Sequence, residues 1–236
     1  MTEGTLTGEK PTRGIGAPPA GAGHHWSDWV GFTVYSSAVI WGASKGSGVN
    51  VYGLPILLLQ FLYAAGYLLR GSARQTLPGF APRIVAYGTA YIMPAFLLAA
   101  GRWAPQLTQP AASPVLRTAG WILGSAALLF AIRPLWYLRK SFSIEPVARE
   151  LVTTGPYAFA RHPIYTTYLF AYLGLWISTP RPAVTMVLLI WLGLLLKRIQ
   201  LEEAVLQSVY PEYAGYRQRV GMFWPRRIGG LGPRSQ

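Results

Sequence analysis

Six long apolar runs occupy most of the sequence after residue 25, and the charged residues fall mainly between them. An apolar helix needs about 20 residues to cross the hydrocarbon core of a bilayer, with about 17 as a lower limit. The second, third and fourth runs reach this length, whereas the first and fifth are shorter. The runs cover residues 29–44, 51–69, 84–103, 118–138, 165–179 and 183–201. The pattern predicts an all-α polytopic integral membrane protein with about six transmembrane helices.

Prolines and glycines inside these runs indicate how the helices turn and pack. Only residues 180–182, with two prolines, separate the last two runs, which predicts a helical hairpin that crosses the membrane and returns. Pro94 lies inside the third run and predicts a kink. Gly120 and Gly124 in the fourth run have a spacing that lets another helix approach closely. This spacing permits helix association but leaves the oligomeric state open.

The basic residues are distributed unevenly between the two sides that six crossings would define. Of the 21 Lys and Arg residues, 16 fall on the side of the two termini and 4 on the other side, while Arg133 lies within the fourth run. Because positive loops stay in the cytoplasm, we expect a multi-pass protein of the inner membrane with both termini cytoplasmic. The formal net charge of +13 then reflects topology and a surface for membrane lipids. We expect no nucleic-acid partner.

The chain divides into four regions by composition. Residues 1–25 are rich in Gly, Pro and Thr and lack the apolar core of a signal peptide, so we expect a disordered N-terminal tail. Residues 26–138 hold the first transmembrane helices, and residues 139–225 combine a polar cytoplasmic segment with the helical hairpin. Residues 226–236 form a basic C-terminal tail.

One cytoplasmic stretch, LVTTGPYAFARHPIY at residues 151–165, concentrates turn-forming and charged residues between hydrophobic helices. A proline disfavours the helical conformation in the residue before it and suits the first helical position, so we expect a helix to begin at Pro163. Arg161 and His162 would then stand at a helix N-terminus, where anions bind favourably. An isolated histidine is usually structural, and this reading of His162 stays open.

Glu202 and Glu203 are two of only eight acidic residues, and they lie where the sixth run leaves the bilayer. Carboxylates there can accept hydrogen bonds from ribose hydroxyls. Alternatively, the pair is a solvated helix face that balances Lys197 and Arg198.

The sequence lacks the residues that several kinds of binding site and catalytic site require. There is no cysteine, and two of the three histidines, His24 and His25, lie in the N-terminal tail. We therefore expect no metal site, because the sequence cannot supply three or four soft ligands to one ion. The sequence also lacks a glycine-rich dinucleotide fingerprint, a phosphate-binding loop and a nucleophile elbow. These absences exclude Rossmann-type cofactor binding.

Four motifs in order give the chain a family resemblance. They are Gly155-x-Tyr157, then Arg161-His162-Pro163-x-Tyr165, then Glu202-Glu203 after the hairpin, and finally Tyr213-x-x-Tyr216. Over residues 141–225 the chain resembles the isoprenylcysteine carboxyl methyltransferase family, which is related to membrane phospholipid methyltransferases. The chain departs from the family pattern at Thr167, where glycine is common, and at Tyr210-Pro211, where Phe-Gly is common.

The resemblance implies S-adenosylmethionine as the cofactor, bound at the cytoplasmic face in a C-terminal cofactor-binding region, which makes residues 139–225 the catalytic region. It implies a cofactor pocket lined by Tyr157, His162, Pro163 and Tyr165, with Glu202 or Glu203 holding the ribose. Arg161 and Arg198 correspond to family arginines that bind an anionic acceptor, and Glu203 could act as a base if the acceptor were an amine.

We accordingly expect a membrane methyltransferase that acts on a lipid-like or prenylated acceptor entering from the bilayer. Carboxyl O-methylation is the first choice, because a carboxylate needs no general base, and phospholipid N-methylation is the alternative. Two readings from other classes stay open: a nicotinamide-dependent membrane reductase related to sterol reductases, and a non-catalytic scaffold or transporter. A visible inverted repeat, which many transporters carry, is not found in this sequence.

Overall fold

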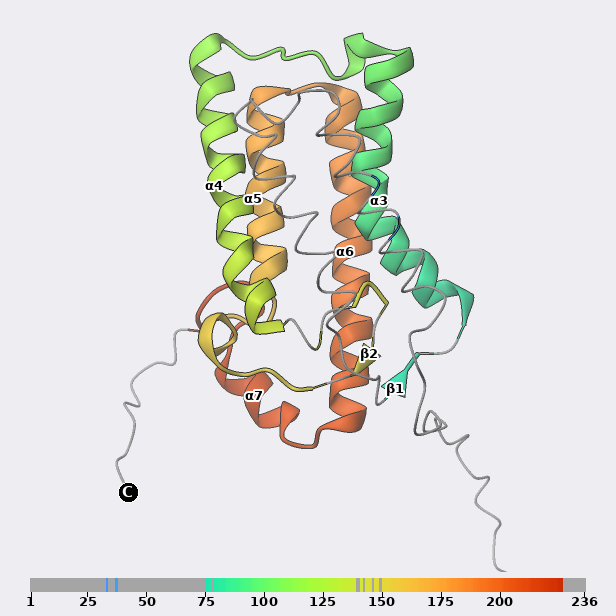
Figure 1. Ribbon diagram of the computed structural model, residues 1–236, viewed down its shortest axis with the longest axis vertical. Coiled ribbons are helices and arrows are strands. Elements are labelled where there is room, and N and C mark those ends of the chain that lie inside the picture. Colours follow the sequence, from blue (N-terminus) through green and yellow to red (C-terminus); the bar gives the residue numbers. More distant parts are fainter. Residues whose placement is uncertain are drawn as a thin grey trace, which may run out of the picture.

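Four long helices dominate the computed structural model (Figure 1). The structure describes residues 33, 37, 75–77, 79–138, 141, 143–145, 147–148 and 150–226. The apolar runs 29–44 and 51–69, the tail 1–25 and residues 227–236 lie outside the described part, apart from positions 33 and 37. The elements are β1 (Gln75–Thr76), α3 (Phe80–Trp103), η2 (Pro105–Leu107), α4 (Pro114–Leu138), β2 (Val147–Ala148), η3 (Gly155–Ala158), α5 (Pro163–Ser178), α6 (Pro182–Val209) and α7 (Tyr213–Arg219).

The four long helices form two pairs, with α4 along α5 and α3 along α6 (Figure 1). The α3–α4 connection and the α5–α6 turn lie at one end. At the other end lie α7, η3 and the antiparallel pair β1–β2. This strand pair, two residues on each strand, is a small departure from the predicted all-α fold. Four predicted helices are therefore present in the expected up-and-down order.

The predicted helix boundaries at prolines are confirmed. Helix α5 begins at Pro163, and His162 precedes it with a non-helical φ of −125° and ψ of 59°. Helix α6 begins at Pro182, so the two prolines at 180–182 form the turn of the hairpin. Pro94 lies inside α3, which bends along its length (Figure 1). Helix α6 continues well beyond the apolar run, to Val209, and thereby carries Glu202 and Glu203 past Lys197.

Glycines allow α4 and α5 to pack with their backbones in contact. A Cβ atom added to Gly174 of α5 would overlap the Gly120 carbonyl oxygen of α4 and lie 2.7 Å from the Gly124 backbone nitrogen. The small-residue spacing found in the sequence therefore serves a contact within the chain.

Two described helices, α4 and α6, are both long and apolar enough to cross a membrane. Helix α3 has 24 residues and α5 has 16, so α5 spans about 24 Å at 1.5 Å per residue. Six crossings and a cytoplasmic C-terminus stay predictions.

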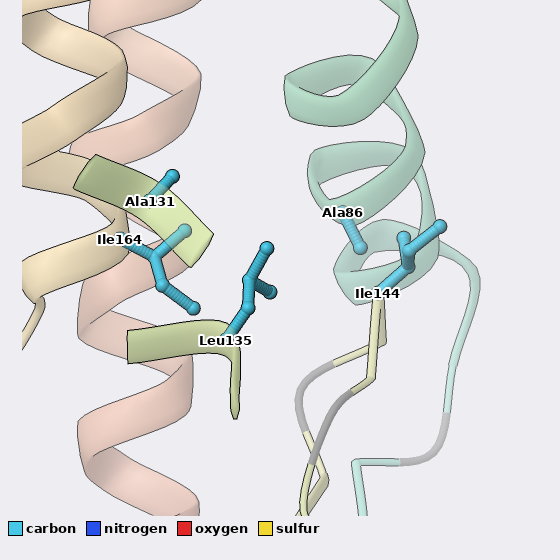
Figure 2. Packing of buried hydrophobic residues seen from close by; sticks show 5 residues of the cluster. All are labelled: Ala86, Ala131, Leu135, Ile144 and Ile164. Atoms are coloured by element: carbon cyan, nitrogen blue, oxygen red, sulfur yellow. The ribbon is translucent and has the colours of Figure 1, made fainter. Parts of the chain in front are cut away.

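A buried hydrophobic cluster joins three of the helices, α3, α4 and α5, close to the end of the molecule where η3 and the strand pair lie (Figure 2). Its buried members are Ala86, Ala131, Leu135, Ile144 and Ile164. Ile144 comes from the connection between α4 and η3 rather than from a helix, so this cluster also fixes that connection against α3. This cluster supports the polar residues of the candidate site.

Candidate functional site

The segment before α5 is held in place by the C-terminal segment after α7. The backbone N–H of Arg161 donates to the Gly221 carbonyl at 2.9 Å, and that of His162 donates to the Met222 carbonyl at 3.0 Å. Ala160 and Gly221 form an isolated parallel bridge. These two N–H groups are therefore committed to the protein. The side chains of Arg161 and His162 are directed by this pairing toward α6.

Glu203 of α6 is the centre of this arrangement. Its Oε1 atom accepts hydrogen bonds from Arg161 Nε at 2.9 Å and from His162 Nε2 at 3.1 Å. Its Oε2 atom lies 3.4 Å from Nε of Arg217, a longer ion pair whose arginine side chain is 53% exposed. The Glu203 residue itself is only 5% exposed. A buried carboxylate with these cationic neighbours is held in its ionised form.

Glu202 holds a second set of partners on the other side of His162. Its Oε1 atom accepts hydrogen bonds from the Tyr165 hydroxyl at 2.6 Å and from Arg198 Nε at 2.8 Å. Nδ1 of His162 lies 3.9 Å from Glu202 Oε2, so the imidazole stands between the two carboxylates. The ring of His162 also stacks on that of Tyr165, with centroids 5.5 Å apart and an interplanar angle of 12°.

Arg198 connects this network to the rest of the fold. In addition to Glu202, its guanidinium donates to three backbone carbonyls: Ile144 at 2.7 Å, Ser143 at 3.3 Å and Ala86 at 3.4 Å. Ala86 and Ile144 are also members of the buried cluster in Figure 2. Arg198 therefore ties α6 to α3 and to the connection after α4, and most of its donors are taken by the protein.

Tyr157 lies beside the network and is joined to it by α7. Its hydroxyl donates to the Pro134 carbonyl at 3.4 Å, and its own carbonyl accepts a 2.7 Å hydrogen bond from the Tyr216 hydroxyl. Burial raises the pKa of Tyr216 to about 12, so this hydroxyl remains a donor at neutral pH. Gly155 shapes the turn, because its φ is +60° and an added Cβ atom would overlap the Tyr137 ring.

The structure brings six of the predicted site residues into one network of hydrogen bonds, a longer 3.9 Å contact and ring stacking, and places the other two next to it. The six are Arg161, His162, Tyr165, Arg198, Glu202 and Glu203. Tyr157 adjoins the network through Tyr216, and Pro163 begins the helix that carries Tyr165. Thr167, a departure from the family pattern, donates to the Ile164 carbonyl of its own helix at 2.7 Å.

Sequence reasoning missed three residues near this network: Tyr213, Tyr216 and Arg217. The two tyrosines form the last of the four family motifs, but the resemblance assigned them no role in the site. Arg217 is one of 21 basic residues, and its nearness to Glu203 depends on the return of the chain through α7.

The site offers one buried and one partly exposed carboxylate, an imidazole and several aromatic rings at the end of apolar helices. Carboxylate oxygens can accept hydrogen bonds from the hydroxyls of a ribose, and aromatic rings can pack against a nucleobase or a sulfonium. These residue types therefore fit a nucleoside cofactor that carries a positive charge. The two buried arginines, Arg161 and Arg198, are paired with carboxylates and carbonyls, so neither presents an open guanidinium to an anion.

Comparison with known proteins indicates a class for this site. Residues 115–213 match the family model described as phospholipid methyltransferase, and this region includes every predicted site residue. The match indicates a membrane methyltransferase, in agreement with the two helices able to cross a membrane. The isoprenylcysteine branch expected from the motifs is not distinguished by this match.

Two curated relatives are similar to part of the chain. One is the cobalt-zinc-cadmium resistance protein CzcN of Cupriavidus metallidurans, 37% identical over 117 residues, which are 48% of this chain and 51% of the relative. The other is the nickel-cobalt-cadmium resistance protein NccN of Alcaligenes xylosoxydans xylosoxydans, 35% identical over 78 residues, 33% of this chain and 37% of the relative. The chain thus spans about half or less of the length of these relatives.

Proposed function

We propose that this protein transfers a methyl group from S-adenosylmethionine to a lipid-like or prenylated acceptor at the cytoplasmic face of the inner membrane. The observation that carries the proposal is the placement of His162 between Glu202 and Glu203, within the region that matches membrane methyltransferases. The cofactor supplies an activated methyl group on its sulfonium. The protein then has to bind both partners, align them and exclude water.

The residues of the network have distinct roles in this proposal. Glu202 and Glu203 accept hydrogen bonds from the ribose, His162 fixes the two carboxylates relative to each other, and Tyr157 and Tyr165 contact the cofactor with their rings. Pro163 fixes the start of α5, the helix that carries Tyr165. Arg161 and Arg198 bind an anionic acceptor only if they exchange a present partner for it, because both guanidiniums are engaged.

For the acceptor, we propose a carboxylate as the first candidate. Arg161 and Arg217 stabilise the ionised form of Glu203, which makes this carboxylate a weak base for removing a proton from an ammonium group. A carboxylate acceptor is already ionised at neutral pH and needs no base. The half-exposed Arg217 supplies a cation close to Glu203 that an acceptor can reach from outside.

Phospholipid N-methylation is the second candidate, and the family match favours it. The names of the two relatives give metal resistance but no reaction. Among the described residues, no group of three or more His, Cys, Asp or Glu side chains is arranged to hold a metal ion.

The first test is calorimetric titration of S-adenosylmethionine and S-adenosylhomocysteine into the full chain purified in detergent. We expect wild-type binding, a loss of at least about tenfold in affinity for His162→Ala, and no change for Lys197→Ala, which alters an exposed cation on α6. Folded wild-type protein that binds neither compound would refute the proposal, and the nicotinamide cofactors would be titrated next. Equal affinity in His162→Ala would refute the placement of the site.

A second test identifies the acceptor. Protein in vesicles is given S-adenosylmethionine with a labelled methyl group, together with a farnesylated cysteine or with phosphatidylethanolamine. A methyl ester releases methanol in base, whereas a methylated amine keeps its label. Label released by base supports the carboxyl acceptor, and stable label on the phospholipid overturns it in favour of N-methylation.

A further inference from the structure

Arg133 carries a charge on α4, a helix that is long and apolar enough to cross a membrane. It lies five residues before the last residue of α4, Leu138, which is about 7.5 Å along the helix axis at about 1.5 Å per residue. The residue is exposed, and within the part of the chain that the structure describes its guanidinium makes no hydrogen bond or ion pair. An unpaired cation therefore stands on an apolar helix.

The surface around Arg133 is apolar and aromatic. Residues three and four positions apart lie on the same face of a helix, and at these distances from Arg133 every residue is large and exposed. With Arg133 they make up what we call the Arg133 face: Leu129, Phe130, Arg133, Trp136 and Tyr137. Ala131 and Leu135, two positions to either side of Arg133, are buried in the cluster of Figure 2. The Arg133 face is thus turned away from the packed interior.

The apolar part of this surface continues along α4. Ile122 and Val115 are both exposed, and with Leu129 they recur at intervals of seven residues, or about two helical turns. The stripe from Leu129 to Val115 is about 21 Å long, which exceeds the roughly 15 Å of hydrocarbon in one leaflet of a bilayer. Helix α4 lies at one edge of the bundle in Figure 1, packed along α5.

The composition of the Arg133 face suits a lipid phosphate. An unpaired charge is costly on an apolar surface, and arginines near the end of a membrane helix extend toward the headgroup region. A guanidinium matches a phosphate with two parallel hydrogen bonds, and Trp and Tyr favour the same interfacial depth. The ring of Tyr137 packs against Gly155 of η3, where an added Cβ atom would overlap it.

We propose that the Arg133 face binds one anionic phospholipid, whose phosphate pairs with the guanidinium and whose acyl chains lie along Leu129 and Ile122. Charge decides between the occupants, because a further apolar helix brings no anion to Arg133, and a free phosphate gains nothing from the apolar stripe. The bound lipid lies next to Pro134, whose carbonyl accepts the hydrogen bond from Tyr157 of the candidate site. The inference goes beyond the proposed function and does not depend on it.

The first test is native mass spectrometry of the full chain in an uncharged detergent, titrated with phosphatidylglycerol. We expect wild type to bind one molecule of this lipid more tightly than any further molecules. Arg133→Gln should bind it at least roughly tenfold more weakly, as expected for lost hydrogen bonds to a charged group. Arg133→Lys keeps the charge but not the planar fork, so its loss should be smaller. Lys197→Gln, which removes an exposed cation of α6, should leave the affinity unchanged.

The second measurement is thermal unfolding with and without saturating phosphatidylglycerol. Without lipid, Arg133→Gln should unfold at the wild-type temperature, because the described fold holds no contact of this guanidinium that could be lost. With lipid, wild type should gain more stability than Arg133→Gln, since a ligand stabilises the folded state that binds it. Inorganic phosphate at the same concentration should stabilise neither protein.

Several results would overturn the inference. Equal losses for Arg133→Gln and Lys197→Gln indicate a general attraction of anionic lipids to a basic surface, and unchanged affinity of Arg133→Gln removes the site. Stabilisation by inorganic phosphate shows a site for a free anion. A lower unfolding temperature of lipid-free Arg133→Gln shows that the guanidinium serves the fold. If lipid-free wild type is an oligomer and Arg133→Gln a monomer, a second copy of this chain covers the face.

Discussion

Arg198 provides the sharpest test of how this site is built, because sequence reasoning and structure give it different tasks. The motifs suggested an arginine that binds an acceptor, whereas the structure shows an arginine residue that is 6% exposed and whose guanidinium is hydrogen-bonded to the protein. Its two shortest hydrogen bonds are to Ile144 at 2.7 Å and to Glu202 at 2.8 Å. We expect Arg198→Ala to destabilise the fold before it affects any ligand.

The size of the effect follows from these contacts. Hydrogen bonds to a charged group contribute about 1.5–3 kcal/mol each, and breaking a buried ion pair by removing one partner costs about 3–5 kcal/mol. The two short bonds alone reach this range, so we expect a loss of about 3–5 kcal/mol. For a protein of this size the loss corresponds to a decrease of roughly 6–20 °C in the unfolding temperature.

The assay is thermal unfolding of the full chain in detergent without ligand, followed by circular dichroism. Lys197→Ala is the matched control, since it removes an exposed cation one residue away and should change stability by no more than about 0.5 kcal/mol. Arg198→Lys keeps the charge but not the planar fork, so its loss should fall between the two. If Arg198→Ala unfolds like Lys197→Ala, the structural role is wrong and binding of an acceptor becomes the better explanation.

Two further predictions concern the helix packing and the tyrosine of α7. Gly174→Ala places a methyl group against the backbone of Gly120, so we expect a loss of about 1–3 kcal/mol in detergent unfolding. Gly193→Ala, where an added Cβ meets nothing within 4 Å, should leave stability nearly unchanged, and equal effects would contradict the close packing. The folded-state pKa of Tyr216 is about 12, above its unfolded value of about 10, so its neutral form stabilises the fold fully below pH 10 and this contribution disappears as the pH rises through 12. The stability difference between wild type and Tyr216→Phe should therefore shrink from about pH 10 to about pH 12. A constant difference would show that Tyr216 does not titrate with the fold.

Features that depend on a few neighbouring residues could be predicted from the sequence. Pro163 and Pro182 start their helices because proline restricts its own backbone and that of the residue before it, whatever the rest of the chain does. The apolar runs placed the four described helices within four residues of their observed bounds, except that α6 ends at Val209, eight residues beyond its run. The convergence of His162 with Glu202 came from the family motifs, since no local rule brings together residues 40 positions apart.

Contacts between particular residues that lie far apart in the sequence could not be predicted. Arg198 bonds to backbone carbonyls, and because every residue carries one, no sequence pattern marks Ala86 or Ile144 as its acceptors. The spacing of Gly120 and Gly124 indicated a close helix contact, but only the fold shows that Gly174 of the same chain occupies it.

The polar network also has a structural task that bears on how ligands bind. It lies at the end of the molecule that holds α7 and η3, with Arg198 linking α6 to α3 and Arg161 linking the start of α5 to α6 and to the C-terminal segment. A ligand that hydrogen-bonds to Glu202 or Glu203 therefore competes with contacts that hold the fold. Most substitutions in the network should consequently change stability and affinity together, and neither measurement alone separates the two roles.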